Sequence, residues 1–93
     1  IKLPSETLEK LVGKYKSEEL DVVVPIFRKG DKLYSRTSFW DIFELIPETE
    51  TQFFGDSRNV GELEIKFISD KEGGIKHIDA HFGLRGIRFH KIK

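Results

Sequence analysis

The stretch Val60-Gly-Glu-Leu-Glu-Ile-Lys-Phe-Ile68 decides the fold class. Its apolar and charged members fall on opposite sides of an extended chain, Leu63, Ile65 and Phe67 against Glu62, Glu64 and Lys66. Alternation with a period of two is typical of a strand that buries one face and solvates the other. We therefore expect a strand over residues 60–68 with one face in a hydrophobic core.

The chain after Gly13 continues in the same manner, as short strands separated by turn residues. The other strands are expected over residues 14–16, 20–28, 32–36, 41–46, 51–54, 75–82 and 84–90. On the strand over 20–28, one face carries Leu20, Val22, Val24 and Ile26. Pro25 cannot donate a ladder hydrogen bond, so it marks an edge, an irregularity or a bulge. Glycine supplies the positive φ needed by the turns 29–31 and 70–74.

The connections between these strands are too short for parallel crossovers, which need a dozen or more residues. A flat sheet of this size would leave two edges and one apolar face uncovered, whereas a closed barrel leaves neither. A helix is expected over residues 6–11, capped by Ser5 and stopped by Gly13. The predicted fold is all-β, an up-and-down antiparallel barrel of about eight short strands with one short N-terminal helix. Its eight Phe and one Trp are available to fill the interior.

Length and composition limit the function classes. Ninety-three residues make one small domain, 1–93, and the absence of Met at Ile1 favours the C-terminal part of a longer chain. Sixteen bases balance sixteen acids, which argues against a nucleic-acid or anionic-membrane partner. The chain has no Cys, so it can form no disulfide or thiolate site, and its redox compartment stays open because the absence of Cys fits both sides of a membrane.

The charges are unevenly distributed along the chain. Residues 41–64 hold seven acids against Arg58, and residues 76–93 hold five bases against Asp79. We expect these two segments to neighbour each other and partly cancel as cross-strand pairs. The alternative is a dipolar surface that docks on a partner.

No catalytic motif is present. None of the six serines is followed three residues later by Lys, and Gly-x-Ser-x-Gly is absent. His77, Asp79 and His81 share one face of a strand, but residues four apart lie about 13 Å apart, too far to hold one ion. We expect that face to be solvated, and we expect no catalytic, cofactor-binding or metal site. Glu44 alternates with Ile42 and Ile46, and its burial would require a partner such as Arg85 or Arg88.

Aromatic residues supply the candidate contact positions. Tyr34, Phe39, Trp40, Phe43, Phe53 and Phe54 could in principle stack bases or sugars, but the zero net charge favours core packing. Phe39 and Trp40 fall in the connection between two strands, where a Trp either caps a barrel or contacts a partner domain. The candidate partner or ligand contacts are Tyr34, Phe39 and Trp40.

Several pieces of the chain together carry a family resemblance. They are Leu8-x-x-Leu11-Val-Gly-x-Tyr15, Gly30-Asp-Lys-Leu-Tyr34, Phe43-x-Leu-x-Pro47-x-x-x-Thr51-x-Phe-Phe54, Ile65-x-Phe67, Asp70-Lys-Glu-Gly-Gly74 with Ile75, and Arg88-x-x-Lys-Ile92. In this order and spacing the chain resembles the lipocalin-like C-terminal domain, largely of unknown function, appended to beta-lactamase-related (penicillin-binding-protein-like) serine hydrolases. The resemblance implies a barrel without catalytic residues of its own. It also implies an upstream catalytic domain in the same chain, and a role in oligomerisation or in substrate access.

Three functions follow from the residues and the resemblance. The leading one is a non-catalytic accessory domain of a serine hydrolase, with the catalytic domain as its partner and homo-oligomers as a further expectation. The second is a lipocalin-like binder of a small apolar ligand, which needs a cavity of about 300 Å³ or more. The third is a metal-dependent enzyme acting through His77, Asp79 or His81.

Overall fold

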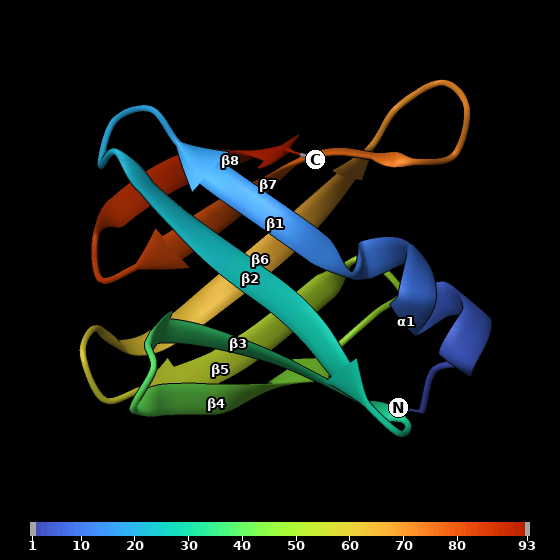
Figure 1. The fold of residues 1–93 in the computed structure, drawn as a ribbon, viewed down its shortest axis with the longest axis horizontal. Helices are drawn as coiled ribbons and strands as arrows, with labels where there is room; N and C mark the ends of the chain where they lie inside the picture. The colour runs from blue at the N-terminus through green and yellow to red at the C-terminus, as the bar shows by residue number, and fades with distance from the viewer. Residues whose placement is uncertain (1, 93) are drawn as a thin grey trace.

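A computed structural model describes residues 2–92; Ile1 and Lys93, the two ends of the expected domain, lie outside the described residues. The fold is one short helix followed by eight strands (Figure 1). The elements are α1 (Ser5–Leu11), β1 (Gly13–Ser17), β2 (Val22–Lys29), β3 (Lys32–Ser38), β4 (Asp41–Pro47), β5 (Gln52–Ser57), β6 (Gly61–Ser69), β7 (Ile75–Phe82) and β8 (Arg85–Ile92). The predicted all-β fold class is confirmed.

The strands form a closed barrel in chain order. Each strand pairs antiparallel with the next, and β1 pairs with β8 through Lys14 opposite Ile92 and Lys16 opposite His90. The seam between β4 and β5 has the shortest register, only Ile46 opposite Phe54 and Pro47 opposite Phe53. Closure removes the sheet edges that an open meander would expose.

The helix differs in detail from the prediction. It begins at Ser5 rather than after it, and no side chain caps it. Instead the carbonyl of Pro4 accepts the N–H groups of Thr7 and Leu8 at 3.1 and 3.2 Å, because proline favours the extended conformation that precedes a helix. Gly13 is not a left-handed stop but the first residue of β1, and the chain already leaves the helix at Val12.

The helix covers one end of the barrel. Its buried residues Leu8 and Leu11 join the core, and the hydroxyl of Tyr15 on β1 donates to the Leu11 carbonyl at 2.8 Å. The Tyr15 side chain is fully buried, and burial raises its pKa far above the ordinary value of 10.0. The hydrogen bond satisfies a helix-terminal carbonyl inside the core, where an unpaired one would be costly.

Apolar side chains fill the barrel interior. Phe67 meets Tyr15 and Phe53 edge-on, with ring centroids 6.2 and 5.4 Å apart. The predicted inward residues of the 60–68 stretch are all buried, as are Ile78 and Ala80 on β7. Three aromatic residues do not fill the interior and stay exposed: Phe39, Trp40 and Phe54.

Strand ends account for the remaining differences. The predicted strand 20–28 begins only at Val22, which is exposed. On its expected inward face, Ile26 is buried, and Leu20 and Val24 are half-buried against the core. Pro25 lies where the pairing of β2 with β3 stops, and its carbonyl accepts the Ser35 hydroxyl at 2.8 Å. Among the described residues, no helix has the length and apolar character needed to span a membrane.

Candidate functional site

The connection between β3 and β4 presents the most exposed aromatic residues. Phe39 and Trp40 form a two-residue turn between Ser38 and Asp41, which are paired across the hairpin. The exposed fraction is 82% for Phe39 and 55% for Trp40. Their place in the connection agrees with the prediction. Exposed aromatic side chains at a hairpin tip suit contact with another surface, because each can bury a large area with little loss of rotamer freedom.

A buried carboxylate holds this turn in place. Asp41, the first residue of β4, is only 2% exposed. Its side chain accepts hydrogen bonds from the Thr37 hydroxyl, the Ser57 hydroxyl at 2.5 Å, and the backbone N–H groups of Arg58 and Asn59 at 2.9 and 3.3 Å. The amide of Asn59 also donates to the Thr37 hydroxyl at 2.5 Å. Asp41 therefore ties the β3–β4 turn to the β5–β6 turn, at the end of the barrel away from α1.

The hydrogen bonds keep Asp41 ionised. Burial on its own raises the pKa of the Asp41 carboxyl, but the hydrogen bonds from Ser57, Thr37 and the two backbone N–H groups outweigh it and lower the pKa to about 2. A charged acceptor with four donors is far more favourable than the same charge left unpaired in the protein. The sequence analysis did not single out this residue. The available signal was the alternation of β4, because Asp41 falls on the same inward face as Phe43 and Leu45.

Tyr34 is not part of this aromatic turn. It lies on β3, five residues before Phe39, which is about 16 Å along an extended strand. Its ring stacks on Phe27 of β2 with centroids 5.9 Å apart, and the Lys29 ammonium lies 5.9 Å from its centroid. The three predicted contact residues therefore lie in two separate regions of the surface. Phe39 and Trp40 lie in the β3–β4 turn, and Tyr34 lies toward the α1 end of the barrel.

The histidine-bearing strand departs from the prediction. His77 is buried, not solvated, and its neighbours in the sheet are Ile68 of β6 on one side and His90 of β8 on the other. Burial lowers the pKa of the His77 imidazole, and the positive charge of Arg88 lowers it further.

The same strand does not gather metal ligands. Nε2 of His77 lies 4.0 Å from Oδ2 of Asp79, whose other carboxylate oxygen accepts a hydrogen bond from Arg88 at 3.0 Å. His81, four residues further, is exposed. Within residues 2–92, no group of three His, Cys, Asp or Glu side chains is close enough to hold an ion.

Glu44 does share a face with Ile42 and Ile46, but that face is the outside of the barrel. The predicted partners of Glu44, Arg85 or Arg88, are wrong. The nearest cation is Lys32, at 4.0 Å, because β3 and not β8 is its neighbour. Arg85 pairs instead with Glu19 at 2.9 Å, and Arg88 with Asp79.

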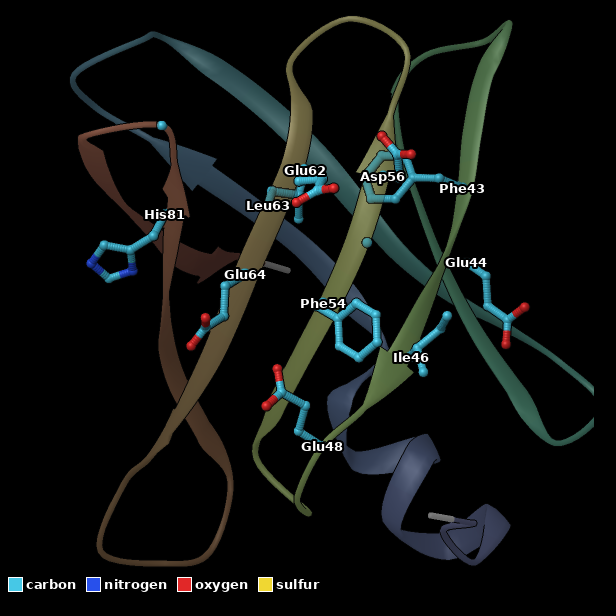
Figure 2. A pocket seen from close by; sticks show the side chains of 12 residues that line it. Phe43, Glu44, Ile46, Glu48, Phe54, Asp56, Glu62, Leu63, Glu64 and His81 are labelled. Atoms are coloured by element: carbon cyan, nitrogen blue, oxygen red, sulfur yellow. The ribbon is translucent and has the colours of Figure 1, made fainter.

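An open groove of about 850 Å³ runs over the outside of β4, β5 and β6 and reaches the end of β7. Figure 2 shows its carboxylates spread along three strands around the Phe54 ring, with His81 at the β7 side. The acidic lining residues are Glu44, Glu48, Asp56, Glu62 and Glu64, and the apolar ones are Phe43, Ile46, Phe54 and Leu63. Gly55 lies on the buried side of β5, and a Cβ there would lie 2.9 Å from a ring carbon of Phe43. We call this feature the acidic groove.

A second, smaller recess of about 180 Å³ lies at the α1 end of the barrel. Its lining is mixed, with apolar residues that include Leu3, Leu8, Leu33 and Leu45, and charged residues Lys2, Asp31, Lys32 and Glu44. Drug-sized ligands occupy pockets of about 300–1,000 Å³, so this recess is small for such a guest.

Comparison with known proteins gives a family. No curated protein and no solved structure matches the chain. A family model described as a domain of unknown function, DUF3471, matches residues 1–91, which is nearly the whole chain. The barrel with its covering helix and exposed aromatic turn therefore belongs to the DUF3471 domain family.

Proposed function

We propose that the domain is a non-catalytic accessory domain of a beta-lactamase-like serine hydrolase. It contacts the upstream catalytic domain of the same chain and thereby supports oligomerisation or substrate access. The observation that carries the proposal is the exposed Phe39–Trp40 turn, which the buried Asp41 carboxylate holds in one position. A rigid aromatic projection is the kind of feature that anchors one domain on another.

Two further observations support this proposal over ligand binding. The barrel interior is packed with side chains, including fully buried Tyr15, Phe53 and Phe67. The recess beneath α1, about 180 Å³, is smaller than pockets that enclose a typical small-molecule ligand. The residues that carry the resemblance to the hydrolase-appended domains also include core positions of this barrel, among them Leu8, Phe53 and Phe67.

The test begins with the natural reading frame that encodes this chain. We expect a Ser-x-x-Lys pair upstream of Ile1, the mark of a serine nucleophile with an adjacent base. In the whole protein, the double variant F39S/W40S should weaken the contact between the domains by about 30-fold, the loss for one strong anchor worth about 2 kcal/mol. The readouts are proteolytic cleavage between the domains and kcat/KM for a chromogenic ester.

The matched control is Leu84→Ser, which changes a fully exposed apolar residue on the β7–β8 turn. It should leave both readouts as in the natural protein. If F39S/W40S behaves like Leu84→Ser, the aromatic turn is not the docking element. If no Ser-x-x-Lys pair precedes the domain, the hydrolase proposal is wrong. Saturable one-to-one binding of an apolar dye by the domain would instead favour the lipocalin-like alternative.

A further inference from the structure

The acidic groove carries a negative charge that its surroundings leave largely unbalanced. Of the twelve lining residues that the structure describes, five are carboxylates and none is Lys or Arg. Within residues 2–92, only one of the five forms an ion pair, Glu44 with Lys32 at 4.0 Å. The Glu64 carboxylate accepts a hydrogen bond from the neutral amide of Gln52, which leaves its charge in place. A concave surface with charges of one sign concentrates cations from solution.

Two of these carboxylates lie directly opposite each other. Register pairs Asp56 of β5 with Glu62 of β6, and both residues fall on the exposed side of their strands. Like charges in directly opposite positions destabilise a sheet, whereas a base at either position would stabilise it. The fold therefore gains nothing from this pair, but a cation between the two carboxylates would relieve their repulsion.

The neighbouring row of the sheet combines an aromatic ring with two further carboxylates. Phe54 pairs with Glu64 of β6 on one side and with Ile46 of β4 on the other, and it is 43% exposed. In Figure 2 the Glu48 and Glu64 carboxylates lie on the side of the ring away from Ile46. An accessible ring beside carboxylates suits a guanidinium, because this planar cation stacks on the ring and donates hydrogen bonds from its edge.

The two rows are spaced like alternate residues of an extended peptide. Phe54 and Asp56 are two residues apart on the same side of β5, which is about 6.6 Å along the strand. Side chains that project to the same side of any extended chain have this spacing. Two arginines separated by one residue therefore place one guanidinium on each row when the segment runs along β5. Adjacent arginines point to opposite sides and place only one.

We propose that the acidic groove binds an extended segment of another protein that carries two arginines separated by one residue. The first guanidinium stacks on Phe54 and pairs with Glu48 and Glu64. The second lies between Asp56 and Glu62. The groove volume of about 850 Å³ leaves room for the backbone that joins the two side chains. A metal ion fits the site less well, because no three His, Asp or Glu side chains of residues 2–92 are close enough to share one.

Titration of the 93-residue chain with short peptides tests the spacing. The probe is acetyl-Thr-Arg-Thr-Arg-Thr-amide, and its matched control is acetyl-Thr-Thr-Arg-Arg-Thr-amide, of the same composition and charge. Two-dimensional NMR shows which backbone amides respond. At low ionic strength the probe should bind one-to-one with a dissociation constant below about 1 mM, with shifts centred on residues 54–56 and 62–64. The control should bind about three- to fivefold more weakly, since it loses one exposed ion-pair site.

Variants assign the two rows. D56N/E62Q removes the opposed carboxylates, so the probe and its control should then bind equally. In the natural chain the probe should bind about two- to fivefold more tightly than its lysine analogue. Phe54→Leu keeps an apolar side chain but removes the aromatic face, so it should abolish this preference for arginine.

The matched control for charge is E18Q/E72Q, which neutralises two exposed turn residues outside the groove lining. It should keep the full preference for the alternating peptide over the adjacent one. Circular dichroism and the NMR spectrum show whether each variant keeps the barrel, so a lost preference reports on the groove and not on unfolding.

Three results would overturn the proposal. The first is the absence of saturable binding of the probe at low ionic strength. The second is equal binding of the probe and its control by the natural chain, because attraction by charge alone does not depend on spacing. The third is tighter binding in the groove of putrescine, a dication of the same charge as the probe, because the occupant would then be a small polycation.

The inference goes beyond the proposed function and does not depend on it. The segment belongs to another protein, and neither Phe39 nor Trp40 lines the groove. Peptide binding is read on the 93-residue chain alone, whereas the accessory role is read from domain cleavage and ester hydrolysis in the whole protein. Either test can therefore fail while the other succeeds.

Discussion

Replacing Asp41 with alanine removes the acceptor of four hydrogen bonds and leaves their donors without a partner at the rim of the barrel. A hydrogen bond to a charged group contributes about 1.5–3 kcal/mol, but some of the freed donors reach water at this end. We expect Asp41→Ala to lower the free energy of unfolding by about 2–4 kcal/mol. For a domain of this size that corresponds to a midpoint about 10–20 °C lower.

The pH dependence gives the same residue a second signature. The pKa of Asp41 is about 2 in the folded chain against an ordinary 3.8, so the folded state favours the ionised form. Its contribution is complete above about pH 4 and is lost as the pH falls from about 4 to 2, an effect of about 2 kcal/mol. Asp41→Asn keeps the shape but cannot ionise, so this part of the acid sensitivity should disappear.

Denaturant unfolding at several pH values measures both effects, and the single Trp reports on the turn directly. Trp40 precedes Asp41, so its fluorescence anisotropy should fall in Asp41→Ala at temperatures where the barrel is still folded. Asp56→Asn, an exposed acid on β5, is the matched control and should change stability by less than about 0.5 kcal/mol. If Asp41→Ala behaves like this control, or if Asp41→Asn keeps the full loss of stability between pH 4 and 2, the assignment of the buried carboxylate is wrong.

Three further substitutions test the core and the groove. Tyr15→Phe removes the buried hydrogen bond to the Leu11 carbonyl and should cost about 1–2 kcal/mol in denaturant unfolding. Gly55→Ala places a Cβ 2.9 Å from Phe43 and should cost about 1–3 kcal/mol, with a thermal midpoint lower by several degrees. The pKa of His77 is lowered below 6.5 by burial first, so the natural chain should lose stability as the pH falls below 6.5. His77→Gln should remove that part of the loss in unfolding curves taken between pH 5 and 8.

Matched variants keep these three tests specific. Tyr34→Phe changes a half-buried hydroxyl and should cost less than Tyr15→Phe. Gly86→Ala meets only the exposed His81 ring, at 3.1 Å, so this side chain can move aside and the cost should be smaller than at Gly55. His81→Gln should leave the loss attributed to His77 in place. Equal effects within any pair would contradict the corresponding assignment.

The strand pattern was predictable because each strand carries its own signal. The alternation over 60–68 and the glycine of the turn 29–31 act locally, and Gly30 does adopt a positive φ of 62°. The burial of His77 was not predictable, because it depends on its neighbours Ile68 and His90, which belong to two other strands. Local patterns specify which residues alternate, whereas register and neighbours decide which outward residues are covered.

The candidate site was only partly visible for the same reason. The exposure of Phe39 and Trp40 follows from their place in a tight connection. The clamp by Asp41 depends on Ser57 and on backbone groups 17 and 18 residues away, which nothing in the local pattern around Asp41 reveals. The two charged segments neighbour each other only where β6 pairs with β7, and no ion pair of residues 2–92 joins an acid of the first to a base of the second. Adjacent strands of the sequence are adjacent in space, and segments half the barrel apart face away from each other.

Pairing of β1 with β8 also governs when the domain can finish folding. Lys14 meets Ile92, so the first strand waits for a partner that is the last part of the described chain to leave the ribosome. Until then the sheet is open, and the free edges of β1 and β7 can pair with any other exposed strand. The domain is therefore most prone to aggregation while it is being synthesised. A truncation that deletes β8 would make this open, unpaired state permanent.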